Sequence, residues 1–266
     1  MRAMVLLVCA ALPWLLCAQV PSVSEGGVVN AASFTQGQAV TQGSLISIFG
    51  NDLASRLAQA DSVPLSNSLA DVESVTFNGI PAPILFVSPG QINAQLPWNT
   101  LGGGVGSGTA TVVVRRGNLS SEPRQIQIGP VSPGIFALGS GAAIAINADG
   151  SLAAPENSIP GFRTRPARAG EVIVVLGTGL GQVDPPAQTA YPSVDALRRT
   201  MTTPTVLIGG REATVHFSGL APEFVGVNQL NVSVPEGVQP GNAVPLQLRM
   251  GGITTADSVT IAVAAN

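Results

Sequence analysis

The feature that most constrains this chain is an internal repeat of a hairpin-forming segment. The first copy, Asn78 to Trp98, reads NGIPAPILFVSPGQINAQLPW, and a longer copy, Gly209 to Pro235, reads GGREATVHFSGLAPEFVGVNQLNVSVP. In both copies a turn leads into an apolar run, and a second turn leads into a strand that closes at a proline, which cannot donate to a β-ladder. A chain that repeats strands and turns in this way is expected to form β-sheets.

The repeat extends beyond the hairpins. SLISIFGNDL, which starts at Ser44, matches EVIVVLGTGL, which starts at Glu171. Each unit spans roughly 90 residues, which is the size of a sandwich domain and not of a solenoid turn. No segment carries an apolar period of 3.6 residues over the length of a helix.

These observations predict an all-β fold made of two tandem immunoglobulin-like β-sandwich domains. The first is expected at residues 19–130 and the second at 131–266, with the junction near the PVSPGIF segment. Stretches without strand character are expected to be loops: 57–69, 155–168 and 184–203, the last with a short helix near Asp195–Arg199.

The segment Gln91–Leu96 alternates apolar and amide side chains with a period of two, so it predicts a strand with one buried face. Its amides at 91, 93 and 95 recur as Gln229 and Asn231 in the second copy. They could form a binding face. Because they recur in both halves, we expect them instead to hydrogen-bond neighbouring loops or the other domain.

The composition excludes some functions. Hydrophobic residues make up 45% of the chain and charged residues only 10%, so the chain can build packed cores. All twelve basic residues are arginine, and the formal net charge is −3. A general nucleic-acid binder needs a basic face that displaces counterions, so we expect no nucleic-acid partner.

The first 18 residues predict a cleaved signal peptide. Arg2 is followed by an apolar run from Met4 to Leu16, and cleavage is expected before Gln19. The run is too short for a membrane span, so we expect no span after cleavage and a secreted, periplasmic or cell-surface location. Lipidation at Cys17 is an open alternative. Both cysteines, at 9 and 17, lie in this segment, which leaves the expected mature chain without a disulfide.

Each half resembles an IPT/TIG-type immunoglobulin-like domain in its strand, glycine turn and proline-closed strand. The motifs NAASF, SLISIFGNDLA, SPGIF, NADGSL, GTGLG and GLAPEFVGVNQLNVSVPEGV, in this order, are similar to the Solibacter-type C-terminal domain, an uncharacterised module of secreted acidobacterial proteins. The resemblance covers Asn30 to Val263 and implies an exported module. It supplies no catalytic residues.

Two motifs could suggest a cofactor or a metal. Gly177–Gly181 follows an expected strand, but a dinucleotide loop needs G-x-G-x-x-G opening a helix, and Asp184-Pro185-Pro186 opposes one. Asn147, Asp149 and Ser151 offer oxygen atoms, but the distal glutamate of a calcium loop is absent. We expect turns at both places, with no cofactor and no metal. His216, the only histidine, has no cysteine or second histidine with which to share a metal.

The sequence offers a possible binding surface. Five arginines lie in two loops of the second half and could form a patch for an anion or a glycan, although solvated loop charge is the favoured interpretation: Arg163, Arg165, Arg168, Arg198 and Arg199. The second hairpin also carries the extra segment Glu223–Gly226, where Glu223 and Phe224 are candidates for a function particular to this protein.

Together these features favour an exported, non-catalytic binding or scaffolding module that acts on a glycan or an envelope protein. An alternative is a secreted hydrolase with a site at the domain junction. It would need clustered carboxylates among Asp149, Glu156, Asp184 and Asp195. A further alternative is an accessory subunit of a larger exported protein.

Overall fold

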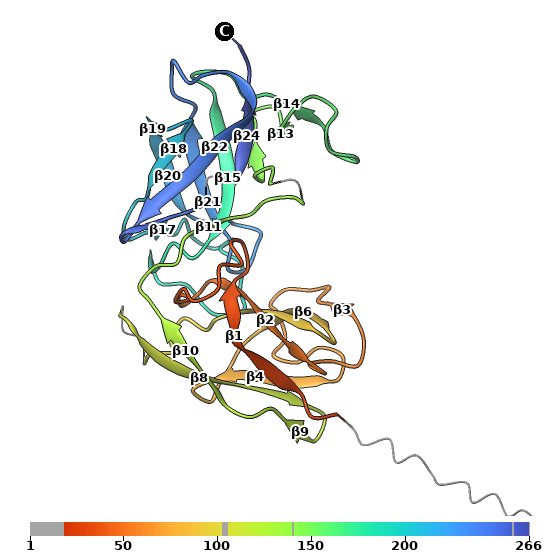
Figure 1. Ribbon diagram of the computed structural model, residues 1–266. Coiled ribbons are helices and arrows are strands. Elements are labelled where there is room, and N and C mark those ends of the chain that lie inside the picture. The colour runs from red at the N-terminus through yellow and green to blue at the C-terminus, as the bar shows by residue number, and fades with distance from the viewer. Residues whose placement is uncertain (1–18, 103–105, 140, 257, 266) are drawn as a thin grey trace, which may run out of the picture.

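The computed structural model describes residues 19–102, 106–139, 141–256 and 258–265. Every regular element among them is a β-strand, and the strands form four sheets (Figure 1). The all-β prediction is therefore confirmed for this part of the chain. None of the described elements is a helix that could cross a membrane. The expected signal peptide, with both cysteines, lies outside the described residues.

The N-terminal half contains two antiparallel sheets around one core. The first sheet has the order β1-β2-β7-β6-β3, with β1 (Ser22–Asn30), β2 (Leu45–Asn51), β7 (Gln91–Gln95), β6 (Ile84–Ser88) and β3 (Ala58–Gln59). The second has the order β10-β8-β4-β5, with β10 (Arg124–Ile128), β8 (Gly108–Arg116), β4 (Val72–Phe77), β5 (Ile80–Pro81) and, beside β8, β9 (Leu119–Ser120). Phe77 and Val112 from one sheet and Ile92 from the other belong to a single buried cluster.

The C-terminal half contains the other two sheets. The larger has the order β14-β13-β12-β15-β21-β20-β17-β16, with β14 (Thr164–Arg165), β13 (Leu152–Ala153), β12 (Ala145–Ile146), β15 (Val172–Thr178), β21 (Asn228–Ser233), β20 (Val215–Leu220), β17 (Arg199–Thr200), β16 (Val183–Asp184) and, beside β15, β11 (Gly134–Ile135). The smaller has the order β19-β18-β22-β23, with β19 (Arg211–Ala213), β18 (Thr205–Ile208), β22 (Gly241–Met250), β23 (Ile253–Thr254) and, beside β22, β24 (Thr260–Val263).

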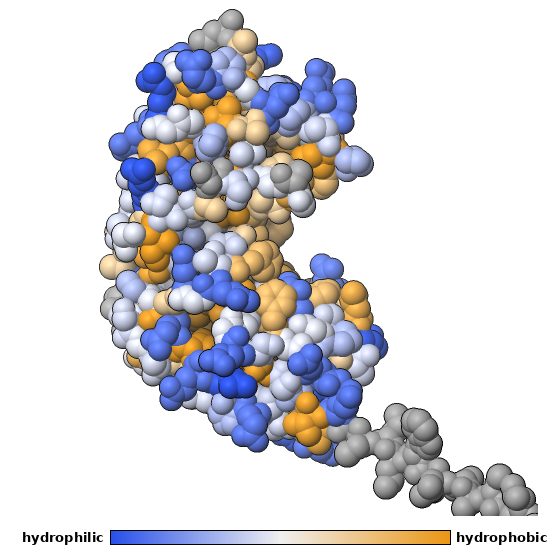
Figure 2. Space-filling view, in the orientation of Figure 1, coloured by the Kyte–Doolittle hydropathy of each residue, from blue (hydrophilic) through white to orange (hydrophobic). Residues whose placement is uncertain are grey.

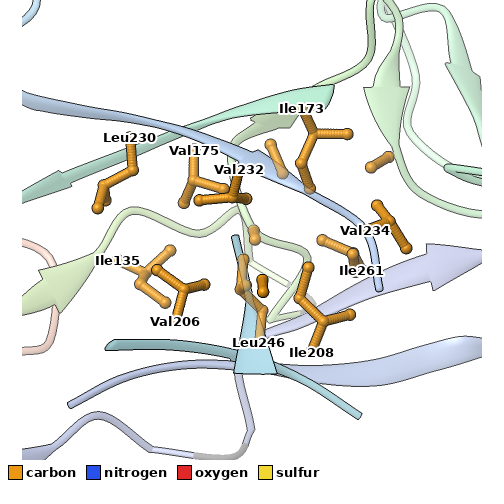
Figure 3. Packing of buried hydrophobic residues seen from close by; sticks show 14 of the residues in the cluster. Ile135, Ile173, Val175, Val206, Ile208, Leu230, Val232, Val234, Leu246 and Ile261 are labelled. Carbon is orange, nitrogen blue, oxygen red and sulfur yellow. The ribbon is translucent and has the colours of Figure 1, made fainter. Parts of the chain in front are cut away.

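The second core shows how period-two strands fill a sandwich. Val175 on β15 and Leu230 and Val232 on β21 point toward Val206 on β18 and Leu246 on β22 (Figure 3). All five side chains are fully buried. Alternate residues of each strand meet in the space between two sheets, so a strand needs only every second residue to be apolar.

Strand β7 bears out the expected alternation. Ile92, Ala94 and, just after the strand, Leu96 are fully buried, while Gln91 and Asn93 are half-buried on the outer face of the sheet. The tight turn before this hairpin is also as expected. Asn78 and Gly79 have φ values of 50° and 80° between β4 and β5, and a two-residue hairpin turn with φ > 0 at both central residues favours this pair.

The two halves are joined by buried hydrogen bonds. Thr178, at the end of β15, accepts a hydrogen bond from Leu45 N at 3.0 Å and donates to Gly226 O at 2.7 Å. Asn30 Nδ2, at the end of β1, donates to Ser132 O at 2.6 Å. An apolar cluster that includes buried residues of both halves surrounds these bonds: Leu45, Ala221 and Val227.

A second set of contacts ties the loop before β17 to the first half. Gln95 is only 1% exposed, and for this residue the expected bonding of the amide row to a loop and to the other half is confirmed. Its Oε1 accepts from Ala190 N at 2.8 Å and its Nε2 donates to Gly43 O at 3.1 Å. Thr189 Oγ1 accepts from Trp98 N at 3.1 Å. The space-filling view shows that the molecule is nevertheless hollowed on one side between the two halves, where much of the surface is apolar (Figure 2).

The expected loops contain short strands that the sequence did not predict. β3, β14, β16 and β17 each have two residues, too few for a periodic pattern. β3 and β17 pair with the longer strands β6 and β20, while β14 and β16 pair with the two-residue strands β13 and β17. The short helix expected at Asp195–Arg199 is wrong. Arg199 instead pairs with Gly219 of β20 as the first residue of β17, so sheet pairing overrides the local preference.

Candidate functional site

The five arginines singled out from the sequence lie in two separate groups. Arg163, Arg165 and Arg168 are at or near β14, at one edge of the nine-stranded sheet. Arg198 and Arg199 are at β17, near the opposite edge, and five strands of the sheet lie between (Figure 1). The structure therefore does not bring the arginines into a single patch.

The group at β14 is an ion network that neutralises itself. Arg165 Nη2 donates to Glu171 Oε1 at 2.6 Å, and Arg165 Nε donates to Asp149 Oδ2 at 3.0 Å. Arg163 Nη2 reaches the same Asp149 oxygen at 3.0 Å. The hydrogen bonds from Arg165 lower the pKa of Glu171 to about 2 and hold the pKa of Asp149 well below its usual range. Both carboxylates stay charged at neutral pH, so the network fixes loops and offers little to an anion. Arg168 is exposed beside it.

The turn that carries Asn147, Asp149 and Ser151 is closed by its own hydrogen bonds. Asp149 Oδ1 accepts from the backbone N of Ser151 at 3.1 Å and from its hydroxyl at 2.6 Å. Asn147 Nδ2 donates to Ser151 Oγ at 3.1 Å. These oxygens serve the hairpin between β12 and β13. Among the described residues, no three His, Cys, Asp or Glu side chains gather where they could hold a metal ion.

The glycine turn after β15 serves the joint between the two halves. A Cβ at Gly179 would collide with Ser132 O, and one at Gly181 would lie 2.7 Å from Pro130 O. Both glycines have positive φ, 87° and 82°, so the segment needs glycine for the backbone path and for the close approach. No helix follows that could hold a pyrophosphate.

Arg198 and Arg199 have different roles at the other edge. Arg198 pairs with Asp195 through two bonds of 2.6 and 3.0 Å, and its Nε donates to Pro186 O at 3.1 Å. The hydrogen bonds from Arg198 lower the pKa of Asp195 to about 2, so this pair is ionised and holds the loop. The Arg199 guanidinium carbon instead lies 5.0 Å from the ring centroid of Phe217, a cation–π distance. Arg199 makes no ion pair with any described residue.

Arg199 and Phe217 lie in a groove of about 580 Å³ on the outer face of the sheet. The amides of Gln229 and Asn231 complete its polar side, and Gln229 Nε2 donates to Asn231 Oδ1 at 2.8 Å. The opposite wall is the loop before β17. There Val194 and Leu197 are 71% and 66% exposed, although both are apolar. The groove therefore combines an arginine that forms no ion pair, an aromatic ring, two amides and an apolar rim. Asp195, which is paired with Arg198, also lines it.

The extra segment Glu223–Gly226 is divided between this groove and the joint. Gly226 accepts the hydrogen bond from Thr178, and Val225 is buried. Glu223 and Phe224 are exposed at the tip of the turn, directly after Pro222, which lines the groove. The insertion thus helps to hold the two halves together and also extends the edge of the groove.

The carboxylates that a hydrolase would need are separated. Asp149 is held by Arg165 and Asp195 by Arg198. Asp184 lies on β16, at the edge opposite Asp149, and Glu156 is exposed in the loop that leads to β14. No hydrogen bond or salt bridge joins any two of these four among the described residues.

Two residues have partners on the outer face that the sequence did not predict. His216 Nε2 lies 2.7 Å from Ser233 Oγ on the same outer face, although no orienting carboxylate contacts this pair within the described chain. Phe217 was treated only as a strand residue. A signal for it was present, because Phe86 occupies the same place in the first copy of the repeat.

Comparison with known proteins places the first half in a family. The IPT/TIG domain model matches residues 28–128, so this region is an IPT/TIG domain. No curated protein matches the chain.

Solved structures show only distant similarity to the chain. The extracellular region of plexin A4 is 11% identical with a TM-score of 0.28, over 92% of this chain and 18% of that one. The γ-CGTase of Alkalophilic bacillus clarkii is 11% identical with a TM-score of 0.27, over 89% and 24%. Domains 5–6 of the S-layer protein SbsC are 14% identical with a TM-score of 0.23, over 89% and 95%. The chain thus spans less than a quarter of the first two structures.

Proposed function

We propose that this chain is an exported, non-catalytic binding module of the cell envelope or extracellular space. In this proposal the signal peptide at 1–18 is removed, and two immunoglobulin-like domains of the Solibacter-type C-terminal module remain as a unit. The ligand is a glycan or an envelope protein.

The observation that carries the proposal is the groove beside β17. Among the described residues Arg199 forms no ion pair, and apolar side chains such as Leu197 stand exposed around it. Exposed apolar groups that cluster around polar ones are characteristic of recognition surfaces. The hydrogen bonds of Thr178 and Gln95 support the proposal further, because they hold the groove in a fixed position relative to the first half. Asp149 lies at the opposite edge of the sheet from Asp184 and from the Asp195–Arg198 pair, and this arrangement favours binding over hydrolysis.

The proposal is tested by incubating the purified chain, residues 19–266, with cell-envelope fractions and a glycan array. We expect retention that falls when Leu197 is replaced by Ser. The control is Leu57→Ser, which removes a similarly exposed leucine from the other half. Absence of retention on every fraction and glycan would overturn the proposal, and so would equal retention of the two variants.

A further inference from the structure

We propose that the groove formed by Arg199, Phe217, Gln229 and Asn231 binds a carboxylate-bearing saccharide. This inference rests on the proposed function and names the ligand class for the same groove. The two copies of the repeat share this outer face of the sheet, but they differ in the residues beside it and in what packs against it.

The β-register shows that the two faces correspond. Phe217 lies opposite Asn231, with a bulge just before it, and Phe86 lies opposite Asn93 in the same way. Gln229 and Gln91 then occupy equivalent places, and each donates to the neighbouring asparagine, at 2.8 and 2.7 Å. A phenylalanine beside an amide pair therefore occurs twice on the outer surface of the chain.

The residue beside the phenylalanine and its amide pair differs between the two copies. Arg199 pairs with Gly219, which lies opposite Gln229. In the first copy Ser88 lies opposite Gln91. Strand β3 pairs with β6, with Ala58 opposite Val87, so the next position along this pairing places Leu57 opposite Ser88. Leucine thus occupies the position where the second copy has a cation. Directly opposite residues of antiparallel strands share a face, so Arg199 adds its charge to the face that carries the amides. Asp184 of β16 lies opposite Arg199 on the same face but forms no ion pair with it.

The first copy also uses its face within the molecule. Leu45 and Gln95, opposite each other at the end of the face, are buried in the joint between the halves. The equivalent residues of the second copy are Val172 and Ser233. Val172 is 42% exposed. The end of the face that packs against the other half in the first copy is therefore left open in the second.

The chemistry of the open face points to an acidic sugar. A guanidinium matches a carboxylate with two parallel hydrogen bonds, and Arg199 can offer its edge while its plane stays over Phe217. With Gln229 Nε2 bonded to Asn231 Oδ1, the Gln229 oxygen and the Asn231 amino group remain as an acceptor and a donor for hydroxyl groups. The apolar rim at Leu197 suits the C–H face of a ring. The outward-facing residues of β21 from Gln229 to Ser233 span about 13 Å, which is long enough for an oligosaccharide.

The test measures binding of oligogalacturonates to the full chain, purified after export, by calorimetry. We expect binding that weakens as salt is raised, because a charge pair is screened. Arg199→Gln should weaken it about tenfold or more, since a hydrogen-bonded charge pair is lost. Phe217→Leu should weaken it less. Arg168→Gln, which removes an exposed arginine at the far edge of the sheet, and Phe86→Leu in the first copy should leave it unchanged. Urea unfolding of each variant checks that the fold is kept.

The probes distinguish the possible failures. Methyl-esterified oligogalacturonates keep the sugar and lose the charge, so equal binding to them would overturn the role of Arg199. Two results would overturn the assignment of a saccharide as the ligand. One is polyglutamate that binds as strongly as the oligogalacturonate. The other is self-association of the chain that Arg199→Gln abolishes. If the chain binds envelope fractions but no uronate, this inference fails and the proposed function stands. If it binds neither, both fail.

Discussion

Thr178 offers a direct way to test how the two halves are joined. Its side chain is fully buried and links Leu45 N and Gly226 O through bonds of 3.0 and 2.7 Å. Thr178→Val keeps the shape of the side chain and removes the hydroxyl. The substitution leaves one buried N–H and one buried C=O without this partner, and each loss costs about 1–2 kcal/mol, so we expect a total of about 3 kcal/mol.

The measurement is urea unfolding followed by tryptophan fluorescence and by far-UV circular dichroism. Trp98 is the only tryptophan in residues 19–266, and its backbone N contacts Thr189 across the joint. We expect the fluorescence transition of Thr178→Val to move to lower urea. The exposed Thr109→Val is the control, and it should change stability by less than about 0.5 kcal/mol. A Thr178→Val effect as small as that of the control would refute the reasoning.

Three further outcomes follow from the packing and the charges. Phe77→Ala should cost about 4 kcal/mol in urea unfolding because it empties the first core, and a loss below about 1 kcal/mol would contradict the burial. Gly226→Ala, at φ 70° and with its Cβ position 3.1 Å from Leu45, should lower the thermal midpoint of unfolding, and an unchanged midpoint would contradict the strain. Glu171→Gln should cost about 1 kcal/mol at pH 7 by breaking the bond to Arg165. The pKa of Glu171 is lowered from 4.5 to about 2, so its stabilisation is complete above 4.5, and the gap to wild type should close as pH falls toward 2. A difference in stability between wild type and Glu171→Gln that widens as pH falls would contradict a stabilising ion pair.

Much of the fold could be predicted because it depends on local patterns. The alternation around Ile92 and the Asn78-Gly79 turn each specify a strand or hairpin within a few residues, and the repeat confirms the reading by giving it twice. The two-residue strands could not be predicted, because a strand such as β17 exists only where its neighbours, here β20 and β16, are in place to pair with it.

The candidate site was less predictable, since charge alone does not say which partner a side chain finds. Arg165 and Arg199 look alike in the sequence, but folding brings Glu171 to the first and Phe217 to the second. The burial of Gln95 is of the same kind, because its partner Ala190 is 95 residues away. Long-range packing decides all three cases.

The central claim is that the second copy of the repeat binds a ligand on its outer face, beside Arg199, and that the first copy does not. Amide chemical-shift mapping of the isotope-labelled chain during titration with oligogalacturonate tests it most directly. We expect shifts at Arg199, Phe217, Gln229 and Asn231, with Phe86 and Asn93 unmoved. Shifts centred on Phe86 and Asn93, or spread equally over both copies, would contradict the claim.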